Sequence, residues 1–280
     1  MENIVFSLIL SQLILLPIAR KWELNLRPVI IVGLLVGLLV GIFIDILSIS
    51  FTMSLFARLL FSITLILLTS LALLLIWFFR DPERIPPEKK NIIVAPADGT
   101  IKYIKRIEVG NIPLSSKGKE HVKLDPVSMD ILPDQKGYLI GIGMSFLDVH
   151  VTRSPIEGKL AYFKHVNGRF YSLKKPDASY KNERAIQIIK NDNFGICLIH
   201  IASRLVRRIV SYVKEGDHLI LGQKIGMIKF GSQVDILLPD IEYLRINTKV
   251  GEKVFAGVTI IATYSPEHSC TKTVKEEELL

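Results

Sequence analysis

Hydrophobic residues are concentrated in the first 80 positions of this 280-residue chain. Apolar runs cover residues 28–49 and 55–79, and each is long enough to cross the hydrocarbon core of a bilayer, which needs about 20 helical residues. A shorter run, 4–19, predicts another span, with a secretory signal peptide as the alternative. Basic residues follow this run instead of preceding it, which favours the span. We therefore predict a membrane anchor over residues 1–80.

The flanks of these runs predict how the anchor is arranged. Gly33, Gly37 and Gly41 recur at every fourth position, which is typical of a helix face that another helix approaches closely. Lysine and arginine are enriched in the 20–27 loop and after residue 80. Because cytoplasmic flanks carry the excess of basic residues, we expect the rest of the chain on the cytoplasmic side of the cell membrane.

After residue 90 the pattern changes to short β-rich runs separated by glycine, proline and aspartate, which predicts a mainly β (β-rich α+β) domain over residues 81–266. Residues 267–280 are predicted to form a polar tail. The expected strands are 92–94, 100–107, 137–142, 149–152, 185–189 and 196–201.

Two segments near the C-terminus, 211–228 and 246–263, form a degenerate repeat. Gly216 matches Gly251 and Gly222 matches Gly257 at a constant offset. Paired hairpin-like units with glycine at the tight turns are typical of a small barrel-sandwich module. The dipeptide Gly231-Ser232 falls between the two copies.

Composition narrows the class of partner. The net charge of +8 favours an anionic partner, and beside apolar spans this is an acidic bilayer surface, since no basic-aromatic nucleic-acid module is visible. Cys197 and Cys270 give neither a disulfide framework nor a metal-ligand spacing, so no metal is expected.

Five short strings carry the candidate chemistry, although each alone is common in turns and strands. They are 79–87 (FRDPERIPP), 95–100 (APADGT), 146–155 (FLDVHVTRSP), 182–184 (NER) and 230–232 (FGS). In this order and spacing they resemble the phosphatidylserine decarboxylase family of pyruvoyl-dependent enzymes, over roughly residues 78–264. The resemblance implies a phospholipid substrate, decarboxylated to phosphatidylethanolamine.

The resemblance also implies self-processing between Gly231 and Ser232. The hydroxyl of Ser232 would attack the carbonyl of Gly231, with His150 as the base and Asp98 orienting it. The products would be chains 1–231 and 232–280 bound to each other, with Ser232 converted to a covalent pyruvoyl cofactor. This group would accept the electron pair released with CO₂, and His150 would return a proton.

Several residues have other interpretations. By sequence alone, His150 fits an ordinary strand position and Asp98 a turn. Arg207 and Arg208 fit either a phosphate-binding pair or a solvated face. Two positions depart from the family pattern: Leu147 replaces a histidine found in some members, and Gln233 replaces a frequent threonine.

Two rival functions remain at this stage. One is a pyruvoyl decarboxylase for a related amino-acid-headed phospholipid. The other is a non-catalytic membrane adaptor in which Ser232 is a plain strand residue; a carrier with Lys229 modified is weaker, because Ile228 and Phe230 are not the methionines of a biotin site. The sequence is also compatible with a homo-oligomer.

Overall fold

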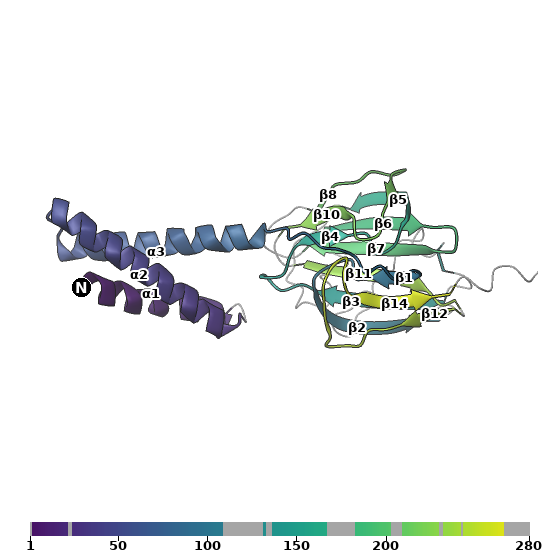
Figure 1. Ribbon diagram of the computed structural model, residues 1–280, viewed down its shortest axis with the longest axis horizontal. Coiled ribbons are helices and arrows are strands. Elements are labelled where there is room, and N and C mark those ends of the chain that lie inside the picture. Colours follow the sequence, from purple (N-terminus) through teal and green to yellow (C-terminus); the bar gives the residue numbers. More distant parts are fainter. Residues whose placement is uncertain are drawn as a thin grey trace, which may run out of the picture. The chain divides into compact units, whose positions relative to one another are not determined.

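The protein contains two compact units, Met1–Phe79 and Arg80–Leu280 (Figure 1). The computed structural model describes residues 2–21, 24–108, 131–132, 136–166, 183–202, 209–229, 232–241 and 243–265, with the backbone alone at Ser232. The first unit is helical and the second is built of strands. Each is described below by itself.

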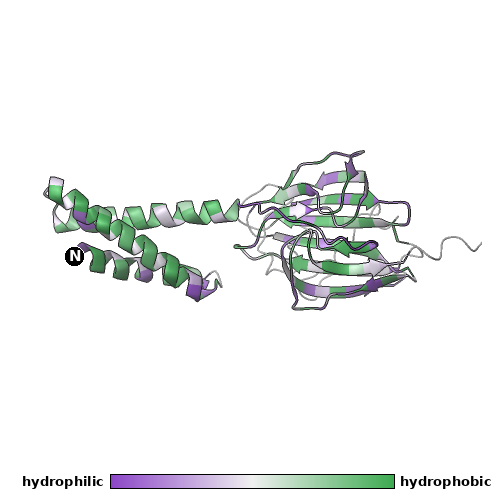
Figure 2. Ribbon diagram, viewed as in Figure 1, coloured by the Kyte–Doolittle hydropathy of each residue, from purple (hydrophilic) through white to green (hydrophobic). Residues whose placement is uncertain are grey.

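The helical unit consists of α1 (Glu2–Lys21), α2 (Leu26–Ser50) and α3 (Leu55–Phe78). All three helices are long and apolar enough to cross a membrane. Most of the residues of these helices are coloured as hydrophobic in Figure 2, and many of their large apolar residues are exposed. A helix that is apolar all round needs an apolar environment. The unit is therefore compatible with membrane association.

Helices α1 and α2 pack closely along the predicted glycine face. A Cβ atom added at Gly41 would lie 2.5 Å from the Cα atom of Ile4 on α1. The hydroxyl of Ser11 donates a hydrogen bond of 2.7 Å to the carbonyl of Gly33. The predicted close approach of another helix to this glycine face is confirmed.

The described residues of the second unit form one eight-stranded and two three-stranded antiparallel sheets. The large sheet has the order β13-β2-β3-β11-β7-β6-β5-β9, and the small sheets have the orders β1-β14-β12 and β4-β10-β8. The strands are β1 (Ile92–Val94), β2 (Gly99–Ile107), β3 (Gly137–Gly143), β4 (Val151–Arg153), β5 (Gly158–Val166), β6 (Arg184–Lys190), β7 (Gly195–Ala202), β8 (Ile209–Ser211), β9 (His218–Leu219), β10 (Lys224–Ile228), β11 (Ser232–Pro239), β12 (Leu244–Ile246), β13 (Lys253–Val254) and β14 (Ile260–Tyr264). The prediction of a mainly β domain after apolar helices is confirmed.

The large sheet is buried on both faces. On one face Ile142, Leu198 and Val234 pack with residues of the two small sheets, such as Ile261 and Ile225. On the other face Leu139, Cys197, Ile199 and Leu237 form a second core. Because side chains alternate between faces along a strand, β7 and β11 supply residues to both cores. The central strands are thereby held firmly, including the start of β11.

The predicted repeat is confirmed and extends further than the sequence indicated. Gly216 and Gly251 have φ angles of 98° and 88°, and Gly222 and Gly257 have 75° and 74°, so the matched glycines occupy matched turns. The strands that follow the matched turns, β9 and β13, pair with β5 and β2, which lie in equivalent places of the large sheet. In the β domain of Figure 1, the half of the sheet that contains β5 is drawn above the half that contains β2.

An earlier pair of segments repeats in the same way. The string 95–99 (APADG) precedes β2 as 154–158 (SPIEG) leads into β5. The two copies are hydrogen-bonded reciprocally: the Val94 amide donates to the Pro155 carbonyl (3.0 Å), and the Arg153 amide donates to that of Pro96 (2.9 Å). Sequence comparison missed this repeat because apart from proline and glycine the two strings share few residues.

One predicted strand boundary was wrong, and one long strand was missed. The strand expected at 149–152 begins at Val151, because residues 144–150 form a loop held by side-chain contacts. Strand β5 was not predicted. Its pairing shifts between Leu160 and Tyr162, and polar residues such as Lys164 and His165 hide the alternation that identifies a strand.

Candidate active site

The ends of strands β11, β3 and β2 lie side by side at Ser232. Ser232 begins β11, the next residue, Gln233, pairs with Gly143 at the end of β3, and Gly143 pairs with Thr100 near the start of β2. Neighbouring strands lie about 4.8 Å apart, so β11 and β2 are about 10 Å apart at this edge. Asp98, directly before β2, is therefore brought to the same edge as Ser232.

The close approach of β2 and β3 requires glycine at position 99. A Cβ atom there would lie 2.5 Å from the carbonyl oxygen of Gly143, a distance that real Cβ atoms do not show. The glycine in the sequence string 95–100 thus has a structural reason. It places Asp98 beside the end of β3.

His150 is held at the same edge by the end of β10. Its carbonyl accepts a hydrogen bond of 3.1 Å from the amide of Ile228, the last residue of β10. Ser232 is only four positions after Ile228, so the Cα atoms of these two residues are at most about 14 Å apart. The fold thus brings His150 and Ser232, 82 positions apart in the sequence, into one region.

The His150 ring is fully buried and its tautomer is fixed by the backbone. Its Nδ1 atom lies 2.8 Å from the carbonyl oxygen of Asp148. A carbonyl only accepts, so Nδ1 carries the proton, and in the neutral ring Nε2 keeps its lone pair. Burial lowers the pKa of His150 to about 4, although the charges of Asp148 and Asp98 oppose this. Near neutral pH the ring is therefore neutral, and Nε2 is in the form that can accept a proton.

Asp98 is held in place by an arginine that sequence reasoning did not assign to the site. Arg84 binds the carboxylate with both terminal nitrogens, at 2.5 and 2.7 Å, and the amide of Ala256 donates to the same carboxylate at 2.8 Å. Asp98 is only 3% exposed. Its charge raises the pKa of His150 through space. Asp98 thus makes its hydrogen bonds with Arg84 and Ala256, and its effect on His150 comes from its negative charge.

Cationic side chains also fix the loop that presents His150. Asp148 accepts from the amide of Ser145 (2.7 Å) and from the Lys253 ammonium (2.5 Å). Arg80 donates to the carbonyl of Leu147 at 2.8 Å. Arg80 and Arg84 belong to the family-like string 79–87, and their contacts here are within the β domain. Membership of that string was the signal for them in the sequence, but it did not indicate which groups they contact.

The opposite face of β11 anchors the residue after Ser232. The Gln233 side-chain nitrogen donates to the hydroxyl of Tyr103 and to the carboxylate of Asp235, both at 2.8 Å. Tyr103 in turn donates to Asp235 at 2.8 Å. Both Gln233 and Asp235 are buried. Gln233, which stands where family members often have threonine, is therefore accommodated in a buried network. This network holds the first residues of β11 after Ser232.

Other predicted site residues have no described geometry. Gly231, Arg207 and Arg208 lie outside the described residues, as does Cys270. Among the residues that the structure describes, no group of three or more His, Cys, Asp or Glu side chains could hold a metal ion.

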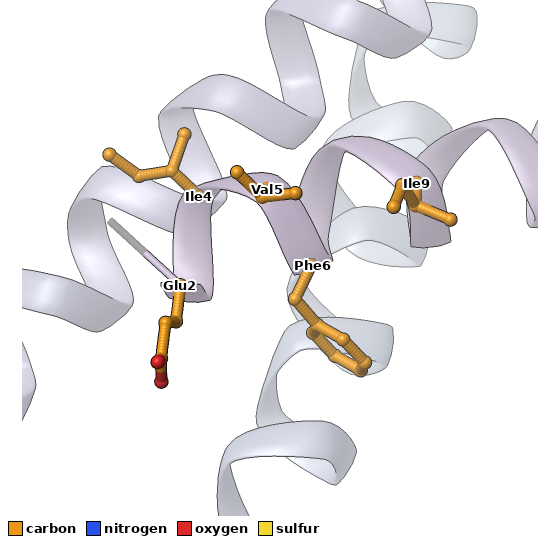
Figure 3. A pocket seen from close by; sticks show the side chains of 5 residues that line it. All are labelled: Glu2, Ile4, Val5, Phe6 and Ile9. Atoms are coloured by element: carbon orange, nitrogen blue, oxygen red, sulfur yellow. The ribbon is translucent and has the colours of Figure 1, made fainter.

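A pocket on α1 belongs to the helical unit and not to this site. It is lined by Glu2, Ile4, Val5, Phe6 and Ile9 (Figure 3). Four of the five side chains are apolar, as expected for a helix face exposed to lipid. It adds nothing to the candidate chemistry.

Fold and site together define a class: a helical unit compatible with a membrane, followed by a β domain in which a buried histidine and a buried aspartate lie at the same end of the sheet as the start of a central strand. The model of the family described as phosphatidylserine decarboxylase matches residues 71–262. The chain belongs to this family, and it is a carboxy-lyase. Membership of an enzyme family argues against the alternative function considered from sequence, a non-catalytic membrane adaptor.

Known relatives are similar over most of their length. A protein named putative archaetidylserine decarboxylase proenzyme from Methanocaldococcus jannaschii is 43% identical, over 69% of this chain and 91% of the relative. Its counterpart from Methanothermobacter thermautotrophicus is 39% identical, over 72% and 85%. The phosphatidylserine decarboxylase proenzyme of Erythrobacter litoralis is 38% identical, over 70% and 75%. All three are named as proenzymes, in agreement with the expected self-processing.

Proposed function

We propose that this protein decarboxylates phosphatidylserine to phosphatidylethanolamine by means of a pyruvoyl group formed from Ser232. The observation that carries the proposal is the buried neutral His150, held beside the start of β11 with Nε2 as the proton-accepting atom. Membership of the phosphatidylserine decarboxylase family supplies the reaction class. The proenzyme names of the relatives support self-cleavage.

Self-cleavage follows from what His150 can do. Nε2 takes the hydroxyl proton of Ser232 as the oxygen attacks the Gly231 carbonyl, and the imidazolium then gives that proton to the departing amide nitrogen. The negative charge of Asp98 stabilises the imidazolium through space, because it raises the pKa of His150. Arg84 holds the carboxylate of Asp98 in place through two hydrogen bonds.

The surroundings of position 232 fit a pyruvoyl group. Such a group would be bound through the amide nitrogen of Gln233, whose side chain is anchored by Tyr103 and Asp235. When present, its ketone supplies an electron sink for the loss of CO₂. The residues of this chain then have two roles. The positively charged side chains near the site attract the anionic head group of the lipid, and His150 returns a proton after CO₂ has left.

The location of the reaction is part of the proposal. Basic residues after the last apolar helix favour a β domain on the cytoplasmic side of the cell membrane, where anionic head groups are abundant. Arg207 and Arg208 are proposed to contact the lipid phosphate. The chains 1–231 and 232–280 are proposed to stay associated, because β11 lies between β3 and β7 of the longer chain.

A second substrate deserves a direct comparison, because two relatives are named for archaetidylserine. Both lipids carry a serine head group, so the chemistry at position 232 would be the same. Parallel assays of CO₂ release from the two lipids in matched vesicles would decide between them. Equal rates would mean that the site reads the head group alone.

The processing proposal is tested by intact-mass measurement of the purified full-length chain. We expect two chains divided between Gly231 and Ser232, the shorter one blocked at its N-terminus and reducible by borohydride. Ser232→Ala and His150→Ala should each remain uncut. His218→Ala, which removes an exposed histidine of β9, is the matched control and should process normally. A single uncut wild-type chain with decarboxylase activity would contradict the proposal.

A further inference from the structure

A second buried histidine lies outside the predicted relay. His200 is on β7 and is 3% exposed. Neither of its ring nitrogens, Nδ1 or Nε2, makes a hydrogen bond of regular geometry among the residues that the structure describes, and the nearest polar neighbour is the backbone of Ala185, which only partly offsets the effect of burial on its pKa. Leaving buried polar atoms unpaired costs about 1–3 kcal/mol, and native proteins seldom do so without a reason. Burial lowers the pKa of His200 to about 4, so the ring is neutral near pH 7.

The strand register brings His200 next to the position of the reacting serine. On β11, Ser232 pairs with Ala202 and Val234 pairs with His200. The register is regular from Ser232 to Leu237, so positions 200, 202, 232 and 234 share one face of the sheet. Positions 200 and 232 are diagonal neighbours, about 7–8 Å apart, a separation that long and ring-bearing side chains bridge.

The two histidines approach this position from different elements. His150 is tied to the end of β10, and β10 packs against β7, the strand that carries His200. The small sheet β4-β10-β8 thus covers the face on which His200 lies. The region around position 232 thus contains two neutral imidazoles, one that the proposed mechanism uses and one that it does not.

Pyruvoyl formation has a step that needs a base of its own. Cleavage leaves the ester between Gly231 and the Ser232 oxygen, and this ester must lose the α-proton of Ser232. The pair of electrons from that C–H bond forms the Cα=Cβ bond, the Cβ–O bond breaks, and Gly231 departs as a carboxylate. His150 has already returned its proton to the amine in the preceding step.

We infer that His200 is the base for this elimination and the acid for the step that follows it. It takes the α-proton of Ser232, and as imidazolium it returns the same proton to Cβ, which turns the enamine into an iminium ion. Water then hydrolyses the iminium to the ketone and releases ammonium. The proton count of His200 is unchanged after one round. This inference rests on the proposed self-processing at Gly231 and Ser232.

The test uses the ester that should accumulate without this base. Full-length His200→Ala and the size-preserving His200→Gln are purified in detergent and treated with neutral hydroxylamine, which cleaves esters. We expect both to convert to the pyruvoyl form about 100-fold or more slowly than wild type. Hydroxylamine should split them between residues 231 and 232 and yield a fragment that starts with unblocked Ser232. His150→Ala, which cannot form the ester, should resist hydroxylamine.

A matched control is Gln187→Met, which removes another buried polar side chain from the neighbouring strand β6 and should process at the wild-type rate. The inference is overturned if folded His200→Gln processes as fast as wild type, or if it stays uncut and resists hydroxylamine. Should wild type itself never yield the blocked shorter chain, the proposed function fails instead, which separates the two outcomes.

Discussion

His150 owes its proposed role to its surroundings more than to its position in the sequence. The Asp148 carbonyl fixes its tautomer, and burial keeps it neutral. A histidine in water would be half protonated at pH 6.5 and would lose activity as a base below that pH. In this site the loss should come at lower pH.

This leads to a pH prediction for self-cleavage. The rate of cleavage of freshly folded precursor should stay nearly level from pH 7 to about pH 5 and fall only as the pH approaches 4, because His150 is neutral above that value. The rate can be followed by gel after dilution from denaturant. A midpoint near pH 6.5 would show that the ring is not desolvated during cleavage.

The same shift has a consequence for stability. The pKa of His150 and of His200 is lowered from 6.5 to about 4 on folding. Between pH 6.5 and pH 4 the unfolded chain binds more protons than the folded chain. The free energy of unfolding is therefore highest above pH 6.5 and decreases as the pH falls towards 4. Each histidine accounts for about 3 kcal/mol. Denaturant unfolding of His200→Gln should therefore be less sensitive to pH in this window than that of wild type.

A further residue-scale prediction concerns the ion pair of Arg84 and Asp98. Both side chains are largely buried, so Arg84→Ala should leave the aspartate charge uncompensated and cost about 3–5 kcal/mol in the free energy of unfolding. The exposed pair of Arg106 and Asp240 is the control: Arg106 is 61% exposed, so Arg106→Ala should leave the free energy of unfolding nearly unchanged. Equal losses from urea unfolding of the two variants would refute the structural role of Arg84.

At the scale of elements, the site depends on the narrow spacing of β2 and β3. Gly99→Ala should force the Gly143 carbonyl away, cost about 1–3 kcal/mol, and slow self-cleavage because Asp98 moves with the strand. Gly251→Asn is the control: the position has a positive φ that asparagine tolerates, and nothing lies within 4 Å of an added Cβ. Processing assays and thermal unfolding of both variants check this prediction.

The elements also show how a repeated fold makes one site. Asp98 precedes β2 in one copy of the repeat, and the equivalent residue in the other copy is Glu157. His150 stands before β4, and the equivalent residue in the first copy is Asn91. Each chemical group is thus present in one copy, and the reciprocal hydrogen bonds of Val94 and Arg153 bring the two copies together. The site is formed where they cross.

At the scale of the whole molecule, every described site residue belongs to the second unit. A chain that begins at Arg80 should therefore still cut itself between Gly231 and Ser232, at a rate within a few-fold of the full-length protein. It should lose flotation with lipid vesicles, because the three apolar helices are gone. Mass measurement and flotation of the two proteins, side by side, check both statements. Failure of the shorter protein to process once folded would mean that the helices take part in the site.

Much of the candidate site was accessible from sequence because its residues lie in short strings with family character. Asp98, His150 and Ser232 were named from such strings. Arg84, Tyr103 and His200 were not assigned roles, because their importance comes from contacts that only the folded chain makes. The spacing between Tyr103 and Gln233, or between His200 and Ser232, carries no local signal.

The sequence by itself determined the apolar helices, the β character of the rest and the repeat around Gly216 and Gly251. These are local properties: hydrophobic length, alternation and glycine at tight turns. Only the tertiary structure decided which residues share an environment. The strand register placed His200 diagonal to Ser232, and burial made both histidines neutral. Register and burial arise from contacts between distant segments, and therefore no single stretch of the chain contains them.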